Sequence, residues 1–365
     1  MGRSSPGPGV VEGPVDRGTG TPPARAGAGS DAPASDPAAS ASAGPGLRHS
    51  AALVRGPGEV VDVAAAFLDE GLRAGDLPVL AAPPEAADAV RRALGVRAGA
   101  VEVDGRVCLL GARAPDAVGV LRTALDRAVA SGSGRLRVLA VTTFGPDPRH
   151  WREIRRYEAA SNALVAALPV TALCVYDRSD VPDDALDTAR ATHPELLMGG
   201  LRVSNSEYVL PDPCLRELAA AREPLETGTP VFAVDDVPTL PRLRGALREV
   251  LAAVVPDPDQ RADLHLAASE VAANAFRHGR QPVSARVWAD ERSVVCTVTD
   301  SGRGHDDPFA GFAPAHGDDL AAGGMGLWLA RKLWDSVDLL PGPVGGLTVR
   351  LATTLHAPSS GRGAA

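Results

Sequence analysis

The sequence predicts two successive folded regions: an α/β sheet covered by helices on both faces, and then helices packed on one side of a largely antiparallel sheet. Over residues 47–212, short β-rich runs alternate with amphipathic stretches, which is the pattern of an α/β domain. Over residues 231–356 the expected order is a strand, two helices, two strands, a glycine-rich segment, a helix and a last strand. A chain of 365 residues is long enough for two such domains.

The elements of the first region follow from its glycines and its apolar runs. Residues 51–75 predict a strand, a glycine turn and a helix. Further strands are expected over 76–84, 106–111, 135–145 and 170–177, and further helices over 85–95, 115–132 and 151–168. The turn RGPGEVV has the position of a phosphate-binding loop but lacks the Lys-Ser/Thr pair of that loop. A tight strand-to-helix turn is therefore favoured over a degenerate nucleotide-binding loop.

The second region contains one helix, 240–254, whose apolar residues recur at roughly helical spacing. A second helix includes SEVAANAFRHG, residues 269–279. The remaining elements are strands over 231–235, 283–290, 293–300 and 347–355 and a helix over 326–337.

The segments outside these regions are rich in small residues, glycine and proline. Residues 1–46 are dominated by Gly, Ala, Ser and Pro, so we expect them to be disordered. Residues 213–230 read as a linker and 357–365 as a second disordered tail. The apolar runs are only strand-length, no secretory signal is evident, and the four cysteines lack metal-ligand spacing. These features favour a cytoplasmic protein with reduced thiols.

Composition excludes several mechanisms. The formal charge of −8 and the pI of about 5.5, without a compensating basic stripe, argue against direct nucleic-acid binding. Lys332 is the only lysine, and it stands in RKLW. It therefore supplies neither a Walker-type phosphate loop nor the VAIK motif of a protein kinase.

One helix combines an apolar face with two polar residues on a common side. In SEVAANAFRHG, Glu270 and Asn274 are four residues apart, which places them on the same side of the helix. A carboxylate and a carboxamide are costly in a packed interior unless they have partners. The pair therefore indicates a cleft.

Two glycine motifs follow in the same region. Asp300 ends a strand and is followed by Gly302 and Gly304, so its carboxylate can accept a hydrogen bond from an exocyclic amine while a flat ring approaches the backbone. About twenty residues later, three glycines open a helix, where free N–H groups favour an anion: Gly323, Gly324 and Gly326. A β-turn and a helix cap are the structural alternatives. The segment between them, 305–322, lacks periodicity and fits a lid over a ligand.

In this order, the three motifs resemble the N, G1 and G2 boxes of the GHKL ATPase superfamily. EVAANAFRHG also matches E-x-x-x-N-A-x-x-H-G, the N box of the RsbW/SpoIIAB-like anti-sigma factor serine kinases. The resemblance covers residues 231–356 and implies a GHKL (Bergerat) α/β sandwich. It implies that the cofactors are ATP and Mg²⁺.

The resemblance also implies roles for individual residues. Asn274 would ligate Mg²⁺, and Glu270 would be the general base toward a serine hydroxyl or water. Asp300 would bind the adenine amine, and Thr348 of GGLTVRL would complete the adenine pocket. His278 would lie near the phosphates, or would end its helix before Gly279. The glycines that would line the nucleotide and the lid are Gly302, Gly304, Gly323, Gly324 and Gly326.

One feature departs from the family pattern. Ala321 and Ala322 stand where several of these kinases carry a basic residue before the second glycine box. Loss of a cation near the γ-phosphate weakens neutralisation of transition-state charge. Arg303 or Arg277 are the candidates to replace it, and ATP binding is better supported than phosphotransfer.

The first region resembles the MEDS sensory domain, which implies a RecA-like α/β sensor of a small-molecule signal. The resemblance rests on residues 157–200, with an LC-x-YD strand and a THP segment. The residues that match its pattern are Tyr157, Glu158, Cys174, Tyr176, Asp177 and His193. For each of them, core packing or capping is favoured over ligand contact, and Cys174 is expected to be inert.

Together the two resemblances imply a regulator with an N-terminal sensor. Its ATPase domain would bind a sigma factor, or phosphorylate a serine of a STAS-domain anti-anti-sigma protein, and its relatives commonly form homodimers. A sensor histidine kinase is one alternative, but helix 240–254 carries no histidine and His265 lies within the N-box helix. A non-catalytic, ATP-dependent binding module is the other.

Overall fold

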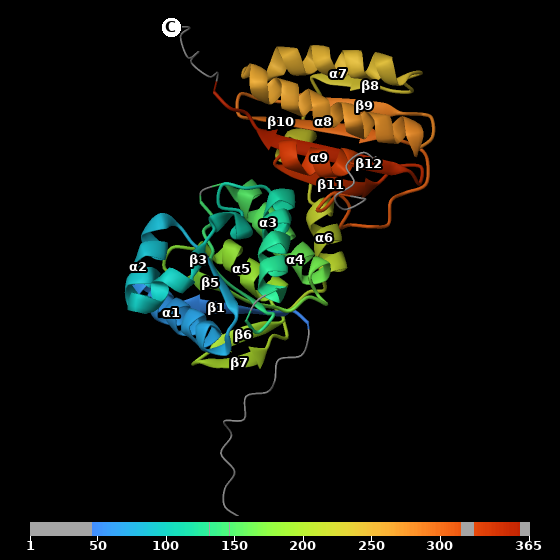
Figure 1. Ribbon diagram of the computed structural model, residues 1–365. Coiled ribbons are helices and arrows are strands. Elements are labelled where there is room, and N and C mark those ends of the chain that lie inside the picture. Colours follow the sequence, from blue (N-terminus) through green and yellow to red (C-terminus); the bar gives the residue numbers. More distant parts are fainter. Residues whose placement is uncertain (1–45, 131, 146, 315–324, 358–365) are drawn as a thin grey trace, which may run out of the picture. The chain divides into compact units, whose positions relative to one another are not determined.

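The computed structural model describes residues 46–130, 132–145, 147–314 and 325–357. The described residues form two sheets, one mostly parallel and one antiparallel (Figure 1). Both predicted tails, apart from their innermost residues, lie outside these ranges, as do Gly323, Gly324 and the second half of the proposed lid. No helix in the described ranges is both long enough and apolar enough to cross a membrane.

The first sheet has the strand order β3-β2-β4-β5-β1-β6-β7 within the described residues, and only the β6–β7 pair is antiparallel. Its strands are β1 (Arg48–Val54), β2 (Leu77–Ala81), β3 (Glu102–Val103), β4 (Leu136–Val141), β5 (Val170–Asp177), β6 (Glu195–Met198) and β7 (Leu201–Ser204). Its helices are α1 (Gly56–Ala74), α2 (Pro84–Leu94), α3 (Ala114–Val129), α4 (Pro148–Leu164) and α5 (Asp183–Thr192).

Helices cover both faces of this sheet, as predicted. Alternate residues of β4 enter different cores: Val138 packs with residues of α3 and α4, whereas Leu139 packs with residues of α1 and α2. A strand that is buried on both faces reads as a continuous apolar run. In agreement, β4, LRVLAV, is buried throughout and is apolar apart from Arg137, whose Nε donates to Asp76.

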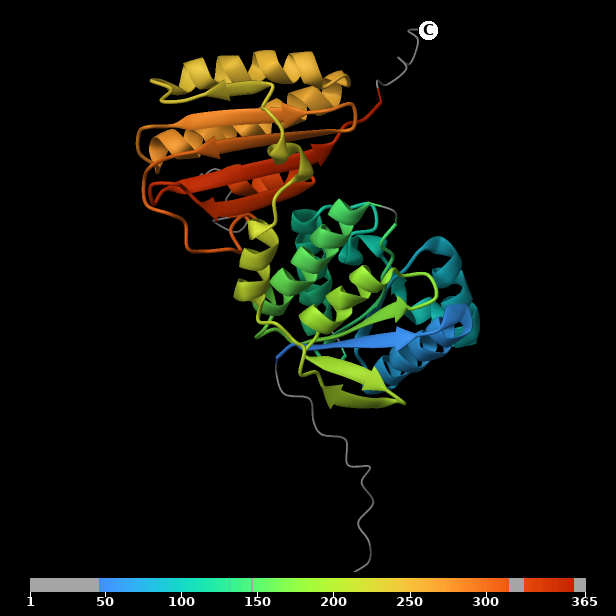
Figure 2. The ribbon, with the colours of Figure 1, turned by 180° about the vertical axis from the view of Figure 1, so that it is seen from behind.

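The second sheet has the order β11-β12-β10-β9-β8 among the described residues, and each neighbouring pair is antiparallel. Its strands are β8 (Phe232–Val234), β9 (Ser284–Ala289), β10 (Ser293–Thr299), β11 (Ser336–Pro341) and β12 (Leu347–Thr354). Three helices, α7 (Leu240–Val254), α8 (Pro258–Arg277) and α9 (Gly326–Leu333), share one core with this sheet. Figure 2 shows the opposite face, where the chain that follows α6 (Pro211–Ala220) passes the strands.

Helix α8 carries the opening motif of the second region, and its ends are fixed by local chemistry. The Asp257 side chain accepts a hydrogen bond from the N–H of Gln260 at 2.8 Å, and Pro258 occupies the first turn. At the other end, the N–H of His278 still bonds the carbonyl of Asn274 before the chain turns at Gly279. The alanines in its second half, from Ala267 to Ala275, are buried, so this part of α8 lies close to the sheet.

Three predicted elements differ from the structure. Residues 106–111 were expected to form a strand, but Gly105–Cys108 form a 3₁₀ turn, η2, because the Asp104 carboxylate accepts the N–H of Arg106. Short apolar runs of this kind are ambiguous from periodicity alone. The helix expected over 326–337 ends at Leu333, and the missed strand β11 follows it.

The stretch expected to be a linker, 213–230, contains most of α6 and the short 3₁₀ helix η3 (Pro224–Thr227). Buried Cys214 and Leu215 place α6 against other apolar residues. Its Gly and Pro content obscured this helical segment.

The glycine turn between β1 and α1 is satisfied within the protein. The N–H of Gly56 donates to the Asp177 carboxylate at 2.8 Å, and Gly56 adopts φ = 78°, which favours glycine. Partial burial works to raise the pKa of Asp177, but hydrogen bonds from Ser179 and Gly56 hold it below its usual range. A carboxylate thus occupies the position at which a phosphate loop would hold an anion, in agreement with the structural interpretation of RGPGEVV.

Candidate nucleotide-binding site

A cavity of about 440 Å³ lies where α8, β10, β12 and the start of α9 meet. Its volume falls within the range of about 300–1,000 Å³ found for small-molecule pockets. It is lined by Val271, Asn274, Ala275, His278, Gly279, Val298, Asp300, Arg303, Gly304, His305, Leu327, Leu347 and Val349. The structure therefore brings Asn274, His278, Asp300 and Gly304 together, although they come from different elements.

Glu270 and Asn274 lie on the same side of α8 but have different neighbours. Asn274 lines the cavity, and a Cβ placed on Gly326 would lie 2.7 Å from its Nδ2 atom. Glu270 is not among the residues that line the cavity. Its Oε1 lies 3.5 Å from Nη2 of Arg244 on α7, and 39% of its side chain is exposed. This arginine partner was not predicted from any motif in the sequence.

Asp300 is held rigidly at the end of β10. It is only 6% exposed, its N–H donates to the carbonyl of Leu347 at 3.0 Å, and its Oδ1 accepts the N–H of Gly302 at 2.7 Å. Among the described residues, its Oδ2 makes no hydrogen bond. This oxygen is available to accept a donor from a molecule in the cavity.

Two further glycines allow the backbone to pass close to Asp300. A Cβ on Gly279 would overlap the Asp300 carboxylate, and a Cβ on Gly346 would overlap the Asp300 carbonyl. The sequence analysis placed Gly279 only at the end of a helix and gave Gly346 no role. The signal that was available is that both glycines stand beside the predicted motifs, in FRHG and GGLT.

The remaining predicted residues divide into three groups. Gly302 touches Asp300, and Gly326 begins α9 against Asn274. Thr348 does not line the cavity: its neighbours Leu347 and Val349 do, while its hydroxyl lies 2.8 Å from that of Thr299. Gly323 and Gly324 lie outside the described residues, as do Ala321 and Ala322.

Of the two arginines considered as replacements for a missing cation, only one reaches the cavity. Arg303 lines it, whereas Arg277 is exposed and does not. Lys332 is engaged elsewhere: its Nζ lies 2.8 Å from Asp116 and 4.6 Å from the centre of the Trp328 ring.

These residues fit a magnesium-bound adenine nucleotide. The buried carboxylate of Asp300 suits an exocyclic amine, and the Asn274 carboxamide is an oxygen ligand of the type that Mg²⁺ accepts. Gly279, which lines the cavity, and Gly326 and Gly346 beside it let the chain pack closely around Asn274 and Asp300.

The residues that match the sensory pattern of the first region form a buried polar cluster. Glu158 accepts hydrogen bonds from the hydroxyls of Tyr176, at 2.6 and 2.7 Å, and of Thr192, at 2.7 Å. His193 is fully buried beside them. Burial raises the pKa of Glu158 and lowers that of His193 to about 3.

Tyr157 and Cys174 of this pattern also have structural partners, as does Asp177 at the turn between β1 and α1. The hydroxyl of Tyr157 donates to the carbonyl of Val107 at 2.8 Å. Cys174 lies on β5 with its Sγ 3.4 Å from Nε2 of His49, and burial raises its pKa.

Asn274, Asp300 and Gly304 thus line one cavity together with Leu327 of α9. Residues 234–353 match the histidine kinase-like ATPase domain. Residues 48–194 match MEDS, the MEthanogen/methylotroph, DcmR Sensory domain. A comparison with curated proteins gives no match. The chain thus combines a MEDS domain with a histidine kinase-like ATPase domain, and the ATPase domain implies ATP binding.

Proposed function

We propose that the protein is an ATP-binding regulator whose ATPase domain phosphorylates a serine of a STAS-domain anti-anti-sigma partner and binds a sigma factor. The observation that carries this proposal is that Asn274, Asp300 and Gly304 line one cavity in the order of an RsbW/SpoIIAB-like kinase. The MEDS domain would control this activity in response to a small molecule.

In this proposal, each residue has one task. Asp300 accepts a hydrogen bond from the adenine amine through Oδ2, and the Gly302 N–H holds Oδ1 in place. Asn274 holds Mg²⁺, which offsets the negative charge of the phosphates when it is bound. Arg303 lines the cavity and takes the role of the missing basic residue. Glu270 takes the proton from the partner's serine hydroxyl.

The surroundings of Glu270 favour a second candidate, a binding module that uses ATP only to shape its surface. Glu270 stands outside the cavity lining and faces Arg244 at 3.5 Å. For phosphotransfer, the partner's serine must reach Glu270 from the exposed side of α8.

Control by the MEDS domain is supported by the contacts that the first residues of the segment between the glycine motifs make. Phe312 is 1% exposed and packs with Ala159 of α4 and with Leu215 of α6. The guanidinium of Arg331, on α9, lies 4.3 Å from the centre of the Phe312 ring and donates to the carbonyl of Ala310. The described part of the proposed lid is therefore joined to a sensor helix and to α9.

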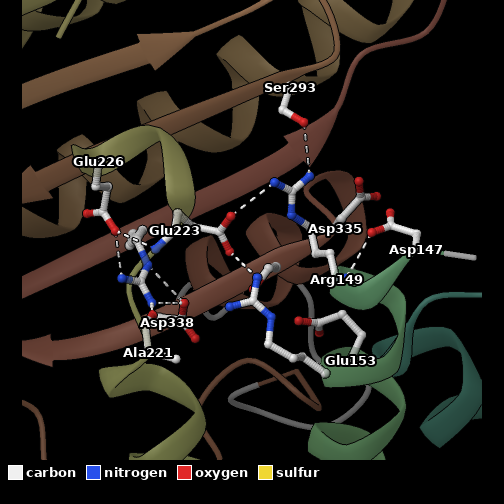
Figure 3. Close-up of polar contacts among 12 residues, drawn as sticks. Asp147, Arg149, Glu153, Ala221, Glu223, Glu226, Ser293, Asp335 and Asp338 are labelled. Atoms are coloured by element: carbon white, nitrogen blue, oxygen red, sulfur yellow. Dashed lines mark hydrogen bonds and ion pairs between the residues drawn. The ribbon is translucent and has the colours of Figure 1, made fainter. Parts of the chain in front are cut away.

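A second connection passes through the chain between the domains (Figure 3). The carboxylate of Glu223 accepts hydrogen bonds from Arg149 at 3.0 Å and from Arg152 at 2.5 Å, both on α4. Arg149 also approaches Ser293 of β10 at 3.4 Å.

Beside this cluster, Asp338 of β11 joins both domains. It pairs with Arg156 of α4, and it also accepts hydrogen bonds from Arg350 of β12 at 2.6 and 3.0 Å. Glu226 completes the network through Arg350 at 2.8 Å (Figure 3). A change in α4 on ligand binding therefore has a path of charged contacts to the ATPase sheet.

The proposed phosphotransfer is tested by incubating the full chain with γ-labelled ATP and purified STAS-domain proteins. We expect label on a partner serine, stable to acid, and its loss when that serine is replaced by alanine. ATP binding without any phosphotransfer would contradict the kinase proposal and favour the binding module. Acid-labile label on the chain itself would indicate a histidine kinase instead.

A further inference from the structure

Three side chains that the ATPase function does not use converge inside the MEDS domain. Ligand atoms of His49 (β1), Cys174 (β5) and His193 (following α5) all lie within 4.8 Å of one another. All three side chains are buried: His49 is 6% exposed, Cys174 is 7% exposed and His193 is fully enclosed. The two imidazole rings lie 4.1 Å apart between their centres. His49 and Cys174 lie on the neighbouring parallel strands β1 and β5, two positions apart in register, since His49 is opposite Ala172 and Cys174 is opposite Ala51.

The hydrogen bonds of His49 fix which nitrogen faces the cluster. The Nδ2 of Asn162 donates to the carbonyl of Thr192 at 2.6 Å, so its Oδ1 is the atom that faces His49. An amide oxygen accepts, and Nδ1 of His49, at 2.9 Å, must therefore carry the proton. The lone pair of His49 is left on Nε2, which points at Sγ of Cys174 at 3.4 Å.

The same reasoning applies to His193. Its Nδ1 lies 3.0 Å from the carbonyl of Ala189, so Nδ1 carries the proton and Nε2 the lone pair. This Nε2 is buried and has no hydrogen-bond partner among the described residues. A buried acceptor without a partner is costly, because it has lost its hydrogen bonds to water. Simple core packing leaves this cost unexplained.

We propose that His49, Cys174 and His193 form a binding site for a zinc-type divalent cation. Two imidazole lone pairs and one sulfur are donors that Zn²⁺ prefers. With Zn–N and Zn–S bonds of about 2.0 and 2.3 Å, a tetrahedral site places N and S about 3.5 Å apart, close to the 3.4 Å between Nε2 of His49 and Sγ of Cys174. The hydrogen bonds to Asn162 and to the Ala189 carbonyl are the outer contacts that orient metal-binding histidines.

Two neighbouring features match such an ion. The Glu158 carboxyl lies 3.9 Å from Nδ1 of His193, and in the ion-bound state a carboxylate there and a thiolate of Cys174 would together balance a charge of +2. A mostly apolar cavity of about 60 Å³ is lined by His49 and Cys174. Three protein ligands leave a fourth position, which is the arrangement of zinc sites that accept water or a small molecule. The site would thus place a Lewis-acidic ion at the wall of the sensor's internal cavity.

The test is a titration of the full chain, freed of metal by chelator, with Co²⁺ and then Zn²⁺. We expect one Co²⁺ per chain, with a sulfur-to-cobalt charge-transfer band and tetrahedral ligand-field absorption, both abolished by Zn²⁺. Cys174→Ala should lose the charge-transfer band, whereas Cys108→Ser, which alters another thiol of the same cavity, should keep it. Asn162→Ala should weaken binding by about 10–100-fold, because it frees the His49 ring.

Folding is followed by circular dichroism for every variant. If Cys174→Ala does not fold, His193→Gln replaces it, and its Co²⁺ affinity should fall while the sulfur band keeps its position. The proposal is overturned if the wild type binds no Co²⁺ in the presence of a weak competing chelator. It is equally overturned if both Cys174→Ala and His193→Gln bind Co²⁺ as tightly as the wild type does. None of these outcomes depends on ATP binding or on phosphotransfer.

Discussion

Glu270 and Asn274 are one helical turn apart, yet their surroundings separate their roles. Asn274 lines the cavity, whereas Glu270 does not line it and lies beside Arg244, although both residues are close to Gly326 at the start of α9. Nucleotide binding needs the first residue, and only the transfer of phosphate needs the second. Substitution of Asn274 should therefore change ATP binding, whereas substitution of Glu270 should change only phosphotransfer.

Glu270→Gln is expected to leave the ATP dissociation constant within about twofold, since the side chain does not line the cavity. Transfer to a STAS partner should fall by about 10²–10⁴-fold, the usual contribution of a general base. Calorimetry and a filter assay with labelled ATP give the two values. Arg244→Gln is the companion variant and should reduce transfer much less. Equal transfer by the wild type and by Glu270→Gln would remove Glu270 from the mechanism.

The glycine that supports Asp300 gives a second prediction at this scale. Gly346→Ala places a Cβ against the Asp300 carbonyl, so the backbone must shift. We expect a loss of about 1–3 kcal/mol in the free energy of unfolding, together with weaker ATP binding. Gly245→Ala in α7 is the matched control, because no atom lies within 4 Å of its Cβ. It should stabilise the protein by about 0.5–1 kcal/mol. Unfolding in urea measures the free energy of unfolding of both variants. A Gly346→Ala variant as stable as the wild type would contradict the close contact.

Among the elements, the long periodic ones could be predicted from the sequence and the short apolar ones could not. Helix α8 is recognisable because its cap, its buried alanines and its terminal glycine agree. Strand β11 was missed because Trp334 and Val337 extend the apolar pattern of α9. The helix nevertheless ends at Leu333, and the carboxylate of Asp335 binds the N–H of Thr354 at 2.7 Å.

The candidate site was predictable to a similar extent. The side chains of Asn274 and Asp300 follow from motif spacing, and the structure places both on one cavity. The direction of Thr348 was not predictable, because a shift of one residue in strand register moves a side chain to the other face. The Arg244–Glu270 contact also depends on how α7 packs against α8, which no local pattern reveals.

The buried Glu223 gives a pH prediction for the segment between the domains. Burial works to raise its pKa, but Arg152 and Arg149 hold it below its usual range. A carboxyl whose pKa is lower in the folded state stabilises the fold above its unfolded pKa of about 4.3, and this stabilisation is lost as the pH falls through the lower folded value.

Glu223→Gln should therefore be less stable than the wild type at pH 7, by about 3–5 kcal/mol for a broken buried pair. The difference should shrink as the pH falls below about 4. Urea unfolding at a series of pH values measures it, with the exposed Glu217→Gln of α6 as control. A difference that does not change with pH would mean that the charge of Glu223 is unimportant.

For the whole molecule, the account requires communication between the MEDS domain and the ATP cavity. Phe312 is the apolar contact that joins the segment after the first glycine motif to α4 and α6. ATP binding to the wild type should therefore change hydrogen exchange in α4 and α6. Phe312→Ala should abolish that change and lower the free energy of unfolding by about 3–5 kcal/mol. Phe312→Leu, which keeps most of the volume, should restore both. Identical exchange changes in all three proteins would rule out this route.

The central claim is that the cavity beside Asp300 binds ATP, and the most direct test is calorimetric titration of the full chain with MgATP. The wild type should bind one ATP per chain. Asp300→Asn should bind about 10–100-fold more weakly, because it loses a charge-assisted hydrogen bond of about 1.5–3 kcal/mol. Asp263→Asn, on the exposed side of α8, should bind as the wild type does. A wild type that does not bind MgATP, or an Asp300→Asn variant with unchanged affinity, would contradict the account.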